Sequence, residues 1–198
     1  MKKLLFVLCC VTVLFAMPMM AGASVLNFDD LNSSNSHQYA QGYGDVPTNY
    51  GGFTWYWWGY IDYWPDIEGS LGVVSQTQVA YNGAGGDTWI ASETPFTFNG
   101  AYFTAWYLND LSINIKGYFQ GSLIEETTVE ANTSGPVYAS LDWSGIDLLT
   151  FAAGGLWEDH FSMDNFTYNE TTVPEPASLL LLGLGLMVLA GMRRKIKS

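Results

Sequence analysis

The middle of the chain consists of short runs in which apolar and polar residues alternate. In LSINIKGY, residues 111–118, the alternation is strict. A period of two is typical of a β-strand with one face buried, and no segment here has a sustained helical period. This part of the chain is therefore predicted to be all-β. Similar short runs are Phe53–Trp58, Phe96–Phe98, Tyr102–Tyr107, Leu123–Glu130, Ala139–Trp143, Leu148–Phe151 and Phe161–Tyr168.

Turn residues separate these runs at frequent intervals. Many short strands with frequent turns favour a two-sheet antiparallel β-sandwich over residues 24–172. About 150 residues is the size of a single domain with one core. The predicted turns are Asn99-Gly100, Asn109-Asp110, Gln120-Gly121, Ser134-Gly135-Pro136, Ser144-Gly145 and Gly154-Gly155.

Charged residues are distributed very unevenly. The 198 residues contain 7 Lys plus Arg against 19 Asp plus Glu. Only Lys116 lies between the two ends, so the stretch from Val25 to Val173 holds one basic residue against 18 acidic ones. Such a surface repels phosphate backbones, which argues against nucleic acid as a partner. It also repels anionic polysaccharide unless a divalent cation bridges the two.

The N-terminus has the three parts of a secretory signal peptide: a pair of lysines, the apolar run Leu4–Phe15 and the small residues Ala21–Ala23. We expect residues 1–23 to be removed after export. Both cysteines, Cys9 and Cys10, lie in the apolar run. The mature chain then contains no cysteine, so packing or bound ions must hold the fold together.

The C-terminus combines an apolar segment with a basic end. Residues Ala177–Met192 would form a transmembrane helix about 24 Å long, somewhat shorter than a hydrocarbon core of about 30 Å. The positive-inside rule places Arg193–Lys197 in the cytoplasm and the acidic domain outside. Before the helix, Val173–Pro176 (VPEP) is stiff and extended, since neither proline fits a sheet or a helix interior. The tail is either a simple membrane anchor or a removable signal.

The order of proline motif, apolar helix and basic end resembles the PEP-CTERM sorting signal. The resemblance covers residues 173–198, with Val173 followed by the core Pro174, Glu175 and Pro176. It implies that an exosortase recognises and processes a membrane-anchored precursor. The mature protein would then reach the cell surface or extracellular matrix of a bacterium, and we expect a Gram-negative one.

Four further segments look like a recurrent family of secreted bacterial domains that is similar to jelly-roll carbohydrate-binding modules. They are Asn27–Leu31, Val79–Gly83, Phe96–Phe103 and Phe161–Thr167. The likeness covers most of Val25–Tyr168 and implies a jelly-roll-like β-sandwich. Its motifs are structural and carry no catalytic signature.

Acidic residues at the two ends of this domain suggest a metal site. Asp29 and Asp30 follow the first strand, and Asp164 lies in the last. The resemblance to jelly-roll modules implies that such residues hold a structural Ca²⁺ where the terminal strands meet. Calcium needs six to eight oxygens, so other groups would have to assist. The alternative is that these carboxylates cap or solvate the strand ends.

Signs of catalysis are weak. The chain has two histidines, His37 and His160, no cysteine in its mature part and no G-x-S-x-G elbow. A glycosidase needs only two suitably spaced carboxylates, but among 18 acids such a pair arises by chance. We therefore expect an exported, non-catalytic surface or matrix protein with polysaccharide as its candidate ligand. A glycan-active hydrolase and a purely structural or adhesive matrix component are the alternatives.

The aromatic stretch FTWYWWGYIDYW, Phe53–Trp64, is the main candidate for ligand binding. In a strand, Phe53, Trp55 and Trp57 would serve the core, while Tyr56 and Trp58 would point the other way. That second face is either covered by a loop or a stacking platform for sugar rings. The candidate ligand-binding residues are Tyr56, Trp58, Tyr60, Asp62, Tyr63 and Trp64.

Overall fold

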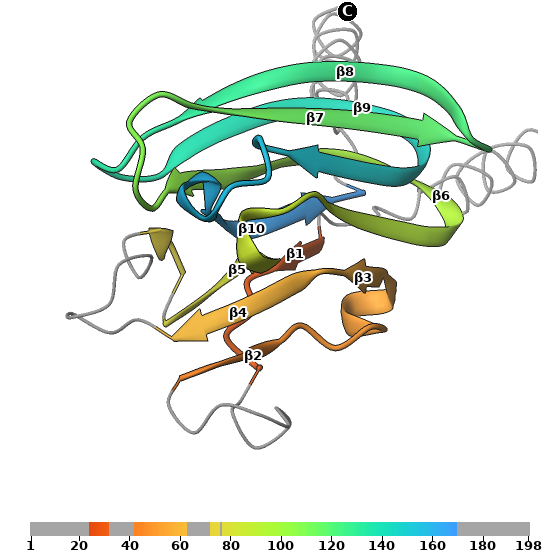
Figure 1. Ribbon diagram of the computed structural model, residues 1–198. Coiled ribbons are helices and arrows are strands. Elements are labelled where there is room, and N and C mark those ends of the chain that lie inside the picture. The colour runs from red at the N-terminus through yellow and green to blue at the C-terminus, as the bar shows by residue number, and fades with distance from the viewer. Residues whose placement is uncertain (1–23, 32–41, 63–71, 76, 170–198) are drawn as a thin grey trace, which may run out of the picture. The chain divides into compact units, whose positions relative to one another are not determined.

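The computed structural model describes residues 24–31, 42–62, 72–75 and 77–169, which belong to one compact unit (Figure 1). The predicted signal peptide and sorting tail lie outside these residues. Within them, no helix is long and apolar enough to cross a membrane. The strands are β1 (Ser24–Leu26), β2 (Tyr43–Asp45), β3 (Thr54–Tyr56), β4 (Trp58–Asp62), β5 (Gln78–Asn82), β6 (Thr88–Ala105), β7 (Leu111–Phe119), β8 (Ser122–Ala131), β9 (Val137–Ala152) and β10 (Phe161–Tyr168). Three 3-10 turns are η2 (Tyr50–Gly52), η4 (Gly83–Gly85) and η5 (Trp157–Asp159).

The strands pair antiparallel in the order β2-β4-β5-β10-β6-β9-β7-β8, with β1 added to β10 and β3 to β6. Figure 1 shows β7, β8 and β9 together on one side of this unit and β2, β3 and β4 on the other. The prediction of an all-β antiparallel fold is confirmed. Hydrogen bonds connect the described strands into one 10-stranded sheet. The predicted division into two sheets with jelly-roll topology therefore stays a prediction.

Strands β6 and β9 are longer than the sequence suggested. β6 continues through Asn99-Gly100 and β9 through Ser144-Gly145, so the two turns predicted there are wrong. A Cβ at Gly100 would lie 2.1 Å from the carbonyl oxygen of Ala139, so glycine here permits a close approach of β9. The register between the two strands also shifts near Gly100. Glycine inside a strand often marks such an approach or bulge rather than a turn.

Aromatic rings fill much of the core. Phe166 of β10 is fully buried and stacks on Phe98 of β6, with ring centroids 4.9 Å apart. Edge-on contacts at 5.4 and 5.8 Å join it to Phe53 and Trp55. These four rings come from three separate parts of the chain, since Phe53 and Trp55 belong to one segment. Burial of large rings supplies the cohesion that disulfides give to other exported domains.

The regular alternation of buried and exposed side chains ends at Trp57, between β3 and β4. Trp57 has a φ of 58°, in the left-handed region that few residues other than glycine adopt. Tyr56 and Trp57 are consequently both exposed, at 47% and 54%, whereas Trp58 turns inward at 3%. The predicted facing of Phe53, Trp55 and Tyr56 is confirmed. The predictions that Trp57 faces the core and that Trp58 lies on the face opposite Trp55 are wrong, because alternation stops at the kink and Trp58 packs against Trp55.

Opposite environments for two adjacent tryptophans lead to a direct stability test. Trp58→Ala should lower the free energy of unfolding by about 3 to 5 kcal/mol, because the indole packs edge-on against the rings of Trp55 and Phe151. Trp57→Ala should cost less than about 1 kcal/mol, as expected for an exposed side chain. Denaturant unfolding of both variants beside the parent protein measures the difference. Equal costs would contradict the facing described here.

Candidate functional site

An open cleft of about 1080 Å³ lies beside the kink at Trp57. We call it the aromatic cleft, because rings make up most of its lining. Its walls come from β2, the β3–β4 junction, β5 with η4, the two residues after β6, and η5 with the residue after it. The lining rings are Tyr43, Trp55, Tyr56, Trp57, Trp58, Tyr81, Trp106, Tyr107, Trp157 and His160.

Three of these rings are well exposed. Trp57 and Tyr56 follow one another at the kink, and Trp157 of η5 is 66% exposed. Tyr56 is held in place by a stacked contact with Trp89 of β6, at 5.0 Å between centroids and 11° between planes. Exposed aromatic faces on a fixed framework are what a ligand with apolar faces requires.

The remaining wall of the cleft is a packed group of rings around His160. Its imidazole stacks on Trp106 at 5.0 Å and 14°, and Trp157 meets it edge-on at 4.6 Å. Tyr81 lies 5.1 Å from Trp106. His160 Nδ1 donates a hydrogen bond to the carbonyl of Trp157, and the backbone N–H of Trp106 donates to the carbonyl of His160. These contacts fix the rings before any ligand arrives.

Asn82, at the end of β5, fastens the loops on which these rings stand. Its side chain is fully buried. Nδ2 donates to the carbonyls of Gly86 and Asp159 at 3.3 and 3.1 Å, and Oδ1 accepts from the N–H of Phe161 at 2.8 Å. One side chain thus joins β5, the residue after η4, the end of η5 and the start of β10. The Asp159 carboxylate closes the same loop by accepting from the Leu156 N–H at 2.8 Å.

Two glycines let the walls come together. A Cβ at Gly59 would lie 2.3 Å from Cζ of Tyr81, so the Tyr81 ring can cross β4 only over a residue without a side chain. At Gly85, φ is 71° and a Cβ would lie 2.0 Å from the carbonyl oxygen of Leu156. Gly85 therefore supplies both the left-handed backbone and the room for η5 to approach η4.

The structure brings only part of the predicted platform to the cleft. Tyr56 and Trp58 both line it, Tyr56 as an exposed ring and Trp58 from the core side. Tyr60 is 1% exposed and lies in the core, because β4 is an interior strand with both faces covered. Asp62 lies outside the lining and accepts a hydrogen bond from Gln78 Nε2. Two further candidates, Tyr63 and Trp64, lie outside the described residues.

Sequence reasoning missed several lining residues. Trp106 and Tyr107 follow directly after β6 and belong to a run that was predicted as strand. Trp157 follows Gly154-Gly155 in a segment without any predicted strand, and Asp45 lies in β2, which the alternation did not reveal. The available signal in the sequence was the apolar pair Leu156-Trp157 directly after Gly154-Gly155. A loop gives such side chains little to pack against, so they are candidates for an exposed binding surface, and both are exposed.

The three acidic residues proposed for calcium do not converge. The described residues contain no group of three or more His, Cys, Asp or Glu that could hold a metal ion. Asp30 accepts from the hydroxyl of Tyr50 at 2.6 Å. Asp29 Oδ1 accepts from the N–H groups of Thr77 and Gln78, while its buried Oδ2 has no hydrogen-bond partner among the described residues. Calcium at this place stays a prediction.

Asp164 has a structural role that does not require a metal. Its Oδ2 accepts from the N–H groups of Val74 and Ser75 at 2.7 and 2.8 Å, and the Ser75 hydroxyl lies 3.1 Å from both oxygens. Burial raises the pKa of the Asp164 carboxyl above its ordinary value, although these donors and the Asn165 N–H favour the charged form. The carboxylate therefore attaches the segment that precedes β5 to strand β10.

The comparisons with known proteins concern the C-terminus. Residues 172–195 match the family model of the PEP-CTERM protein-sorting motif. No curated protein matches the chain. Proteins with the motif are exported and associated with the cell surface in bacteria, and an exosortase processes them. The predicted PEP-CTERM resemblance is confirmed, and the chain is similar to exported, exosortase-sorted proteins over this segment.

Proposed function

We propose that the mature protein is a non-catalytic component of the bacterial cell surface or extracellular matrix that binds glycan in the aromatic cleft. The cleft itself carries the proposal. Pyranose rings have apolar C–H faces that pack on flat aromatic rings, and hydroxyl rims that need hydrogen-bond partners. Tyr56, Trp57 and Trp157 offer exposed rings, and the sorting motif delivers the protein to a compartment where polysaccharide is found.

Polar groups at the cleft suit the hydroxyls of a sugar. The hydroxyl of Thr48, an exposed residue of the lining, can both donate and accept a hydrogen bond. The carboxylate of Asp45 adds an acceptor on the β2 side of the cleft. A few convergent polar groups within a mostly aromatic lining are the usual composition of a ligand site.

The partners of His160 and Asp159 support a non-catalytic role. The Asp159 carboxylate accepts from the Leu156 N–H, and His160 Nδ1 donates to the carbonyl of Trp157. Adjacent in sequence, the two side chains are thus oriented by loop backbone rather than as a base and its orienting acid. A glycan-active hydrolase that uses a carboxylate pair remains the alternative, and reducing-end release from a polysaccharide would identify it.

Loss of an exposed ring should weaken glycan binding. Trp57→Ala should weaken binding to the retained polysaccharide by more than about 2 kcal/mol, roughly 30-fold, as for a central aromatic anchor. The measurement is affinity electrophoresis of the full-length chain in mild detergent against a panel of neutral, basic and acidic polysaccharides. Tyr138→Ala removes a 44% exposed ring on β9, outside the cleft, and should leave binding unchanged. Failure to bind any member of the panel would overturn the proposal.

Processing is predicted at both ends of the chain. Protein recovered from the surface of its native host should have lost residues 1–23 and the residues that follow Pro174-Glu175-Pro176. Intact mass measurement with terminal peptide sequencing detects both events. Recovery of surface-located protein that still carries Arg193–Ser198 would instead support a permanent C-terminal anchor.

A further inference from the structure

The charge of the aromatic cleft restricts the class of glycan it can bind. Asp45 of β2 is exposed and lines the cleft. Among the described lining residues there is no lysine or arginine, and the histidine there, His160, is buried. A uronic acid or sulfated sugar would therefore bring its negative charge next to a carboxylate without a compensating cation. The cleft is electrostatically matched to a neutral or positively charged ligand.

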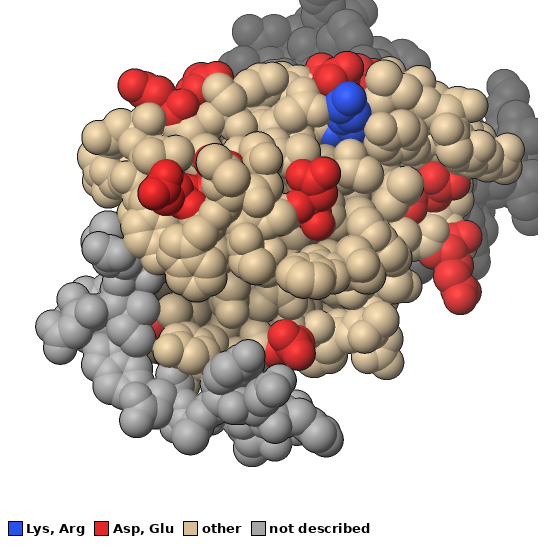
Figure 2. All heavy atoms as spheres, in the orientation of Figure 1, with Lys and Arg blue, Asp and Glu red and all other residues tan. Residues whose placement is uncertain are grey.

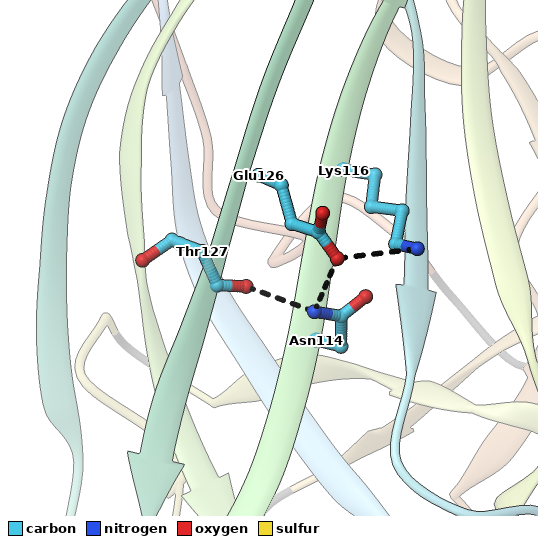
Figure 3. A network of polar contacts seen from close by, with 4 residues as sticks. All are labelled: Asn114, Lys116, Glu126 and Thr127. Carbon is cyan, nitrogen blue, oxygen red and sulfur yellow. Dashed lines mark hydrogen bonds and ion pairs between the residues drawn. The ribbon is translucent and has the colours of Figure 1, made fainter. Parts of the chain in front are cut away.

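The one basic residue of the described chain is occupied elsewhere. Lys116 of β7 lies 3.2 Å from Glu126 of β8, and Asn114 donates to the same carboxylate oxygen (Figure 3). The hydrogen bond from Asn114 and the contact with Lys116 lower the pKa of the Glu126 carboxyl, which favours the carboxylate form that Lys116 pairs with. None of the three residues lines the cleft. Figure 2 shows acidic side chains spread over the drawn face with a single basic patch among them.

Aromatic rings add a second attraction for cations. The face of an indole or phenol ring carries negative potential and attracts an ammonium group within about 6 Å of its centroid. The exposed rings of Trp57, Tyr56 and Trp157 provide such faces in the cleft that Asp45 also lines. A sugar that bears an amino group would gain ring stacking through its C–H face, ammonium–π attraction, and a charge-assisted hydrogen bond to the carboxylate.

We propose that the ligand of the aromatic cleft is a glycan with free amino groups, such as a de-N-acetylated hexosamine polymer. This inference rests on the proposed function, since it names the ligand class of the same cleft. Asp45 is the specificity-determining residue, and the exposed rings supply affinity that any pyranose can use. The acidic surface of the whole domain raises the local concentration of a cationic polymer and speeds its encounter with the cleft.

The test compares matched oligosaccharides on the full-length chain in mild detergent. The probes are β-1,4-linked hexamers of glucosamine, N-acetylglucosamine and glucose, with oligogalacturonate as the anionic member, titrated by calorimetry where the amines are protonated. The glucosamine hexamer should bind about tenfold more tightly than the neutral hexamers, as expected for one hydrogen bond to a charged group. Oligogalacturonate should bind most weakly. Asp45→Asn should lower the ratio of affinities severalfold, and the attraction of the rings and of the acidic surface for the ammonium groups accounts for what is left of it.

A matched charge variant separates the cleft from the general acidity of the protein. Glu125→Gln removes one exposed carboxylate on β8, away from the cleft, and should leave the ratio unchanged. If Glu125→Gln lowers the ratio as much as Asp45→Asn, or if neutral and amino hexamers bind equally, this inference is overturned while glycan binding stands. If no hexamer binds and Trp57→Ala changes nothing, the proposed function fails as well.

Discussion

The buried amide of Asn82 is the interaction on which the arrangement of the cleft depends. It satisfies the carbonyl of nearby Gly86 together with the carbonyl of Asp159 and the N–H of Phe161, which lie almost eighty residues further along the chain. Inside a protein an amide without partners is costly, so these bonds form together or not at all. Because they join β5, η5 and β10, the rings of Tyr81, Trp157 and His160 inherit their positions from the core. This wall of the cleft is consequently tied to the sheet that supports it.

Much of the fold could be predicted from local patterns. The alternation in residues 111–118 corresponds to β7, which buries one face, and the run Phe161–Tyr168 corresponds to β10, which buries both. The turn predicted at Gln120-Gly121 also occurs, with both residues at positive φ. Asn99-Gly100 carries the same kind of signal, yet it lies inside β6. An Asn-Gly or Gln-Gly pair indicates that the backbone needs glycine at that position. Whether the need comes from a turn or from a close neighbouring strand depends on tertiary contacts.

The candidate site was predicted only in its first element. Period-two alternation placed Phe53, Trp55 and Tyr56 correctly and then failed at Trp57, because nothing in the local sequence marks a left-handed tryptophan. That conformation is held by tertiary contacts: the Trp57 carbonyl accepts from the Gly83 N–H at 2.7 Å, and a Cβ at Gly83 would lie within 3.0 Å of the Trp57 ring. The partners of Trp57 across the cleft lie some fifty to a hundred residues further along the chain. Proximity of that kind follows from strand order, which alternation does not encode.

Strand β8, at the edge of the described sheet, affects whether two copies of the protein can pair edge to edge. Unpaired backbone groups on an edge are a template for strand addition, and exposed Leu123 and Ile124 would favour it. Glu125, Glu126 and Glu130 follow on the same strand. Two such edges meeting would crowd carboxylates from both molecules, with Lys116 as the one counter-charge nearby. Mutual repulsion would therefore oppose the pairing of two such edges at low ionic strength, and added salt would weaken that opposition as the screening length shortens.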